Sequence, residues 1–134
     1  MPTFSAASEA RLATCHPDLQ RLFHTVVQET DCTILEGHRG EEAQEKAFRE
    51  GKSKLRWPNG NHNKKPSKAV DAAPFPLDWH DMDKWLAFAE VVQRHAKELG
   101  IALRWGGDWD GKGDRNPSGV LDDLPHYELK DKEG

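Results

Sequence analysis

The chain has 134 residues, of which 36% are apolar and 31% are charged, and a formal net charge of −4, which fits one soluble domain over residues 1–134. Its longest apolar run, Trp85–Ala89, is far shorter than the roughly 20 residues that cross a membrane, and the negative charge disfavours nucleic acid as a partner. The N-terminus has no basic segment followed by an apolar stretch, so we expect no secretory signal. Cys15 and Cys32 are expected to be reduced thiols.

Three segments have the sequence pattern of helices. Residues 17–29 carry one apolar stripe at helical spacing: Leu19, Leu22, Phe23, Val26 and Val27. Residues 40–50 are predicted to form a second helix, which Gly51 ends. The longest predicted helix covers about residues 81–99 and is closed by Gly100.

The remaining regular segments resemble short strands, and we predict them over residues 32–35, 69–73, 101–105 and 126–129. An irregular basic loop is expected over residues 52–68 and a Gly/Asp-rich loop over residues 106–119. Because helices and strands are interspersed and the strands are few, the sequence predicts an α+β fold, a small sheet with helices packed on one side.

Candidate chemistry is restricted to scattered His and Asp residues near the ends of predicted strands. His62 and Asp71 occur in H-N-K-K-P-S-K-A-V-D, and Asp123 and His126 occur in D-L-P-H. Two neutral imidazoles and one carboxylate are a typical ligand set for catalytic Zn²⁺. The spacing alone is weak evidence, because His62 also suits a solvated loop and Asp71 a local cap or ion pair.

The segment D-W-D-G-K-G-D, Asp108–Asp114, superficially resembles a calcium-binding loop of the EF-hand type. Counted from Asp108, the fifth position is Lys112 and the twelfth is Gly119, where a bidentate Glu is needed. We therefore expect a turn-rich loop and disfavour Ca²⁺ as a cofactor.

Five segments in order carry a resemblance to a known family. They are L-x-x-x-H-P-D-L-Q-x-L (12–22), E-G-H-R (36–39), H-N-x-x-P-S-x-A-V-D-x-x-P (62–74), W-G-G-D-W-D (105–110) and L-P-H-Y-E-L (124–129). The chain resembles, over about residues 8–130, the zinc-dependent D-alanyl-D-alanine carboxypeptidase (VanY-like) peptidases. Within them it is most similar to phage endolysins that act as L-alanyl-D-glutamate peptidases. The resemblance implies an antiparallel sheet of the kind shared with Hedgehog-type domains.

The resemblance also implies the site residues. The metal ligands of the family fall on His62, Asp71 and His126, which would hold one Zn²⁺ per chain. The catalytic carboxylate falls on Asp123, which would move the protons of a metal-activated water. Arg39 is implied to hold the substrate carbonyl or the oxyanion.

The implied substrate is the stem peptide of bacterial peptidoglycan, cleaved between L-alanine and D-glutamate to lyse the host of a bacteriophage. A D-alanyl-D-alanine carboxypeptidase and a non-catalytic, zinc-containing wall-binding module are the alternatives, and Asp123 is dispensable only in the module. We expect a monomer that stays in the host cytoplasm until a separate membrane-permeabilising protein releases it. One departure from the family is Gly60, where a serine is common two residues before the first histidine.

Overall fold

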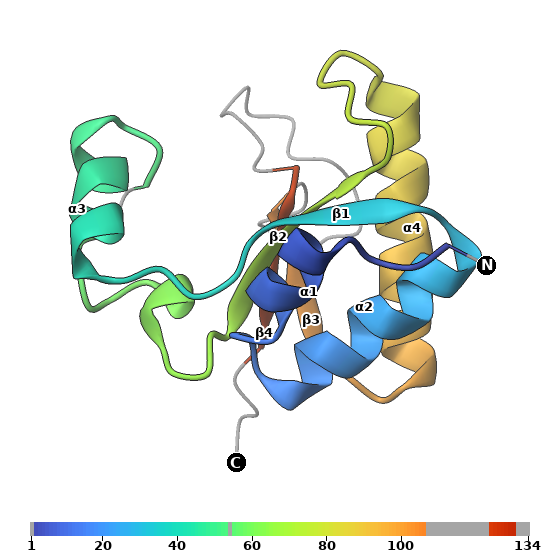
Figure 1. Ribbon diagram of the computed structural model, residues 1–134, viewed down its shortest axis with the longest axis horizontal. Helices are drawn as coiled ribbons and strands as arrows, with labels where there is room; N and C mark the ends of the chain where they lie inside the picture. Colours follow the sequence, from blue (N-terminus) through green and yellow to red (C-terminus); the bar gives the residue numbers. More distant parts are fainter. Residues whose placement is uncertain (1, 54, 107–123, 131–134) are drawn as a thin grey trace.

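A computed structural model describes residues 2–53, 55–106 and 124–130 of the chain (Figure 1). Its helices are α1 (Ala6–Leu12), α2 (Pro17–Glu29), α3 (Glu41–Arg49) and α4 (Met82–Glu98), together with the 3-10 helix η1 (Asn61–Asn63). Its strands are β1 (Cys32–Glu36), β2 (Ala69–Pro74), β3 (Leu103–Trp105) and β4 (His126–Leu129). None of the helices in these described ranges combines the length and hydropathy needed to span a bilayer.

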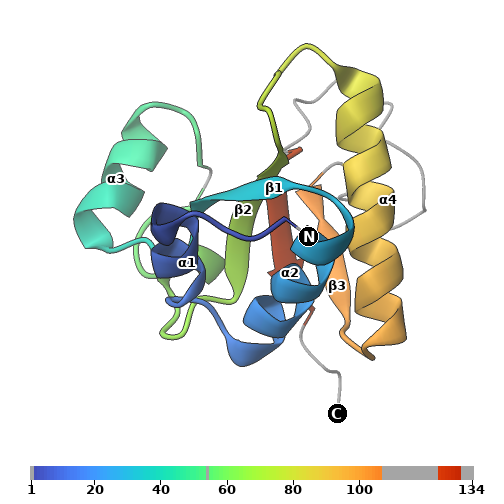
Figure 2. The same cartoon turned by 45° about the vertical axis from the view of Figure 1, so that its right-hand side comes forward.

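The four strands form one sheet in the order β1-β2-β4-β3, and every neighbouring pair is antiparallel. Helices α1, α2 and α4 pack on one face of this sheet, whereas α3 stands apart from it (Figures 1 and 2). The architecture is the predicted α+β fold with helices on one side.

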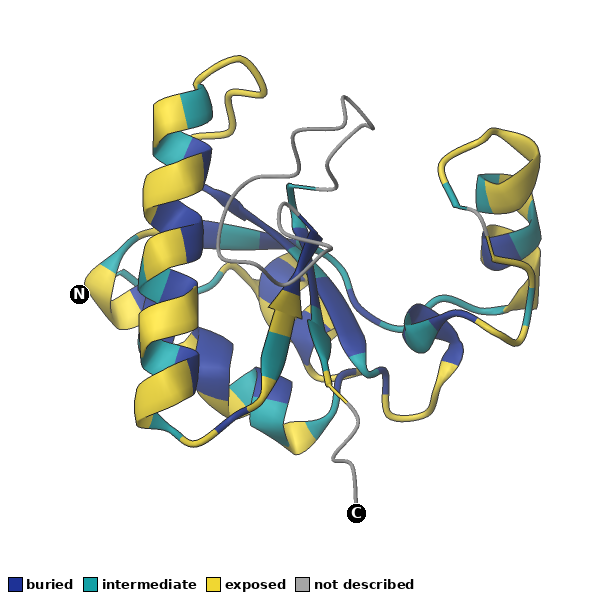
Figure 3. Cartoon of the chain, turned by 180° about the vertical axis from the view of Figure 1, so that it is seen from behind, coloured by how far each residue is buried: buried dark blue, intermediate teal, exposed yellow. Residues whose placement is uncertain are grey.

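The predicted helical stripes form the core between the helices and the sheet. The five apolar residues of the α2 stripe are all buried, and α4 buries Trp85, Phe88, Ala89, Val92 and Ala96. Their outer faces are exposed (Figure 3). Helix α1 was not predicted, because it has only seven residues and buries just Ser8 and Leu12, too few for a helical stripe.

Side chains along the two central strands point alternately into the core and to the opposite face of the sheet. In β2, Val70 and Ala72 lie in the core with the helices, and in β4 Tyr127 does the same. Successive side chains of a strand point to opposite faces, so Asp71 and His126 project from the face that carries no helix.

Candidate metal centre

A β-bulge in β1 adds a third polar residue to the face that carries Asp71 and His126. Ile34 pairs with Ala72, but Glu36 pairs with Asp71, so one extra residue of β1 is accommodated between these pairs. Asp71 in turn pairs with His126 of β4. Directly paired residues share a face, so Glu36, Asp71 and His126 form one row across three strands. Without the bulge Glu36 would lie opposite Val70 and face the helices.

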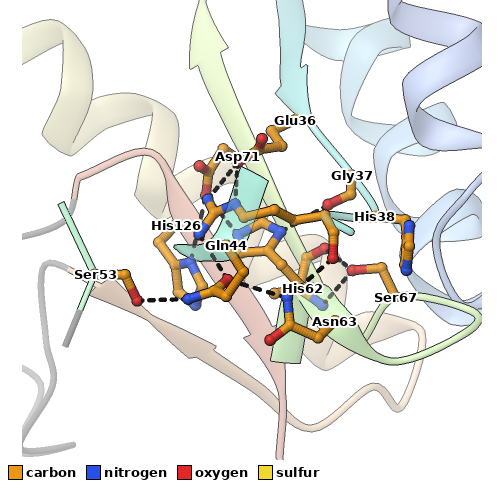
Figure 4. A network of polar contacts seen from close by, with 12 residues as sticks. Glu36, Gly37, His38, Gln44, Ser53, His62, Asn63, Ser67, Asp71 and His126 are labelled. Atoms are coloured by element: carbon orange, nitrogen blue, oxygen red, sulfur yellow. Dashed lines mark hydrogen bonds and ion pairs between the residues drawn. The ribbon is translucent and has the colours of Figure 1, made fainter. Parts of the chain in front are cut away.

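His62 reaches this row from η1 and not from the sheet. The backbone N–H of Arg39 donates to the His62 carbonyl at 2.7 Å, which ties η1 to the chain that follows β1. The His62 side chain is only 6% exposed. Its Nδ1 lies 2.7 Å from the Gly37 carbonyl oxygen and its Nε2 lies 3.2 Å from Asp71 Oδ1 (Figure 4).

His126 approaches the same carboxylate oxygen from β4. Its Nδ1 lies 3.3 Å from Asp71 Oδ1, and its Nε2 lies 2.7 Å from Glu128 Oε1. The other oxygen of Glu128 accepts a hydrogen bond of 2.9 Å from Asn61 Nδ2, which precedes His62 in η1. Glu128 therefore links the two segments that carry the imidazoles.

The hydrogen bonds of the two imidazoles define which nitrogen each presents to Asp71. A carbonyl and a carboxylate accept only, so His62 Nδ1 and His126 Nε2 would carry the ring protons when the opposite nitrogens bind an ion. Those opposite nitrogens, His62 Nε2 and His126 Nδ1, both face Asp71 Oδ1 and could bind one cation together with it. These ligand atoms all lie within 4.8 Å of one another. The donor set therefore fits a divalent metal ion bound by two His and one Asp.

Both carboxylates of the cluster are anionic at neutral pH. Burial raises the pKa of Asp71, but the hydrogen bonds and charges of His126 and His62 outweigh it and hold the pKa well below its usual range. Burial likewise opposes ionisation of Glu128, and the neighbouring His126, Arg104 and Asn61 lower its pKa overall. The site therefore carries the negative charge that a cation neutralises.

Arg39 lies beside the row of site residues, with its side chain only 14% exposed. Its Nε–H donates to Glu36 Oε1 at 2.9 Å, its Nη2 forms a close ion pair with the same oxygen, and its Nη1 donates to Gln44 Oε1 at 3.1 Å. A guanidinium has five N–H donors. Two of them make no hydrogen bond within the described part of the chain.

Asp123, the predicted catalytic carboxylate, lies outside the described residues. So does the Asp108–Asp114 segment in which calcium binding was disfavoured. The structure describes the chain again from Leu124, directly before β4.

Comparison with known proteins identifies the family. A family model described as "Phage L-alanyl-D-glutamate peptidase" matches residues 2–130 of this chain. The chain belongs to this family. The peptidase is 33% identical over 116 residues to the "L-alanyl-D-glutamate peptidase" of Escherichia phage T5, an alignment that covers 83% of this chain and 84% of the relative. Its structure is similar to that of the Serratia marcescens L-Ala D-Glu endopeptidase ChiX, with a TM-score of 0.76 and 29% identity, covering 96% of this chain and 91% of that one.

These findings confirm the predicted family, the predicted fold and the prediction that the chain is a peptidase. The peptidase fold brings His62, Asp71 and His126 together, as the resemblance implied, whereas their individual roles stay predictions. Sequence reasoning missed Glu128, although its position two residues after His126 on a strand is a signal for a shared face. It also missed Gln44, for which the sequence holds no local signal.

Proposed function

We propose that this peptidase hydrolyses the L-alanyl–D-glutamate bond in the stem peptides of bacterial peptidoglycan, with one Zn²⁺ held by His62, Asp71 and His126. The observation that carries the proposal is the convergence of two imidazole nitrogens on one partly buried carboxylate in a chain of this family. The bond is the one named for the phage T5 and Serratia relatives.

The reaction divides between the bound ion and the residues of the chain. His62, Asp71 and His126 would hold the ion, which would supply a water of lowered pKa, toward about 7, and a positive charge beside the scissile carbonyl. Asp123 accepts the proton of the attacking water and later donates it to the leaving amine of D-glutamate. Arg39 donates its two available N–H groups to the carbonyl oxygen as negative charge develops there, a contribution of about 3–4 kcal/mol for one oriented donor.

The other polar residues of the site keep the ligands in place. The Gly37 carbonyl and the Glu128 carboxylate hold the protonated nitrogens of His62 and His126, so that the opposite nitrogens stay directed at the ion. Glu36 offsets the charge of Arg39 in the absence of substrate.

We further propose that the enzyme acts as a monomer, since the site residues come from a single chain. As a phage endolysin it would act on the wall after a separate membrane-permeabilising protein has released it from the host cytoplasm.

Digestion of purified peptidoglycan, followed by mass spectrometry with and without a chelator, tests this function. We expect chelator-sensitive fragments split between L-alanine and D-glutamate. Release of terminal D-alanine would indicate a carboxypeptidase instead, and intact stems from the metal-loaded protein would refute hydrolysis.

The Asp123→Ala variant tests the role of the carboxylate. We expect it to bind zinc like the wild type and to lose about 10²–10⁴-fold in turnover, the usual contribution of a general acid–base group. The neighbouring Asp122→Ala variant is the matched control and should retain turnover. Hydrolysis at the wild-type rate by Asp123→Ala would exclude Asp123 as the base.

A further inference from the structure

Helix α3 is attached to the site through a buried amide. It stands apart from the sheet, and most of its surface is exposed (Figures 1 and 3). Its only buried residue is Gln44, which is 1% exposed. A buried side-chain amide destabilises the fold unless protein groups replace its hydrogen bonds to water. The groups that replace them in Gln44 therefore show which parts of the structure this residue holds together.

The side chain of Gln44 uses its full hydrogen-bonding capacity. Oε1 accepts from Arg39 Nη1 at 3.1 Å and from Asn63 Nδ2 at 3.0 Å. Nε2 donates to Ser53 Oγ at 2.9 Å and to the Leu55 carbonyl at 2.6 Å. Two donors and two lone pairs are all that an amide offers. The amide oxygen of Gln44 therefore contacts residues beside the candidate metal centre, and its nitrogen contacts the loop that follows α3 (Figure 4).

The oxygen of Gln44 is also connected to the segment that carries His62. Asn63 Nδ2 donates to the Arg39 carbonyl at 2.9 Å as well as to Gln44, and Asn63 Oδ1 accepts from the backbone N–H of Gly60 at 2.9 Å. Gln44 Oε1 thus contacts both the guanidinium of Arg39 and the last residue of η1. Glu36 holds Nε and Nη2 of Arg39, so Gln44 Oε1 is the partner that holds its Nη1.

We propose that Gln44 is a positioning residue, whose Oε1 orients the Arg39 guanidinium toward the scissile carbonyl and keeps it in register with η1. The proposal rests on the proposed function of Arg39. In this proposal the hydrogen bonds accepted by Gln44 Oε1 affect turnover, whereas those donated by Nε2 stabilise the loop after α3.

Three variants separate these two halves. Gln44→Leu removes every hydrogen bond at similar volume, Gln44→Glu keeps oxygens for Arg39 and Asn63 but loses both donors, and Ser53→Ala removes one donor-side partner as a control. We expect Gln44→Leu to lower kcat by about 10- to 100-fold, the scale of a misplacement near 1 Å, with zinc content retained. Gln44→Glu should recover most of kcat despite a lower Tm, and Ser53→Ala should retain kcat.

A double-mutant cycle with Arg39→Ala gives a readout that a merely structural role would not move. If Gln44 acts through Arg39, adding Gln44→Leu to Arg39→Ala lowers kcat little further. Full additivity, or equal losses of kcat in Gln44→Leu and Ser53→Ala, would overturn the proposal. If Gln44→Leu does not fold, Gln44→Asn, whose shorter side chain retracts the oxygen, carries the same test. Failure of the wild type to cleave stem peptides would instead refute the proposed function.

Discussion

Substitution of Glu128 tests whether an outer carboxylate orients His126 for metal binding. Its carboxylate accepts at 2.7 Å from His126 Nε2 and at 2.9 Å from Asn61 Nδ2. The first contact orients the His126 ring with Nδ1 toward Asp71, and the second holds η1 against β4. Losing the carboxylate therefore loosens both imidazole-bearing segments.

The magnitude follows from this geometry. Removing a carboxylate that orients a ligand histidine typically costs 10- to 100-fold in metal affinity, which corresponds to about 1.4–2.7 kcal/mol. Glu128→Ala removes both contacts, so we expect a loss near the upper end. Glu128→Gln keeps an oxygen for His126 without the charge, so its loss should lie near the lower end.

Zinc affinity is best measured by competition with a chromophoric chelator at neutral pH, with circular dichroism as the check on folding. Glu90→Gln, which removes the charge of an exposed acid on α4, is the matched control and should bind zinc like the wild type. Wild-type zinc affinity in both Glu128 variants would refute the reasoning.

Two further predictions concern stability. Gly60→Ala should lower the free energy of unfolding by about 1–3 kcal/mol in denaturant titrations, because the new Cβ would lie 2.9 Å from Asn63 Oδ1. Gly40→Ala is the control, since its Cβ would meet nothing within 4 Å. An equal loss of stability in the two variants would contradict this prediction. Burial raises the pKa of Cys15 to about 11 and that of Cys32 to about 12, from an ordinary value of 9.0. Both thiols are neutral in either state below about pH 8. At higher pH the unfolded chain ionises them first, so stability should fall from about pH 8 until the folded-state pKa values are reached, by about 2 kcal/mol per thiol at pH 10.5. The double variant Cys15→Ala/Cys32→Ala should lose less stability between pH 8 and 10.5 than the wild type, and an identical loss would show that the thiols are not shielded.

The elements that could be predicted from sequence are those whose signal is local. Helices α2 and α4 follow from apolar residues at helical spacing, and their observed bounds differ from the predicted ones by at most a residue at either end. The seven residues of α1 bury too little apolar surface to produce such a pattern. The predicted strand over residues 101–105 shortens to Leu103–Trp105, since its length is decided by pairing with β4.

The sequence by itself determined the family and, through its motifs, the three residues His62, Asp71 and His126 that meet at the site. Their spacing alone left a solvated loop as an alternative, because only pairing of β2 with β4 brings the second histidine to Asp71. Tertiary structure alone decided the positions of Glu36 and Gln44. A one-residue bulge turned Glu36 to the face of the site, and Gln44 is buried by hydrogen bonds to residues outside its own helix. Both depend on contacts between distant segments, and such contacts leave no periodic pattern in the chain.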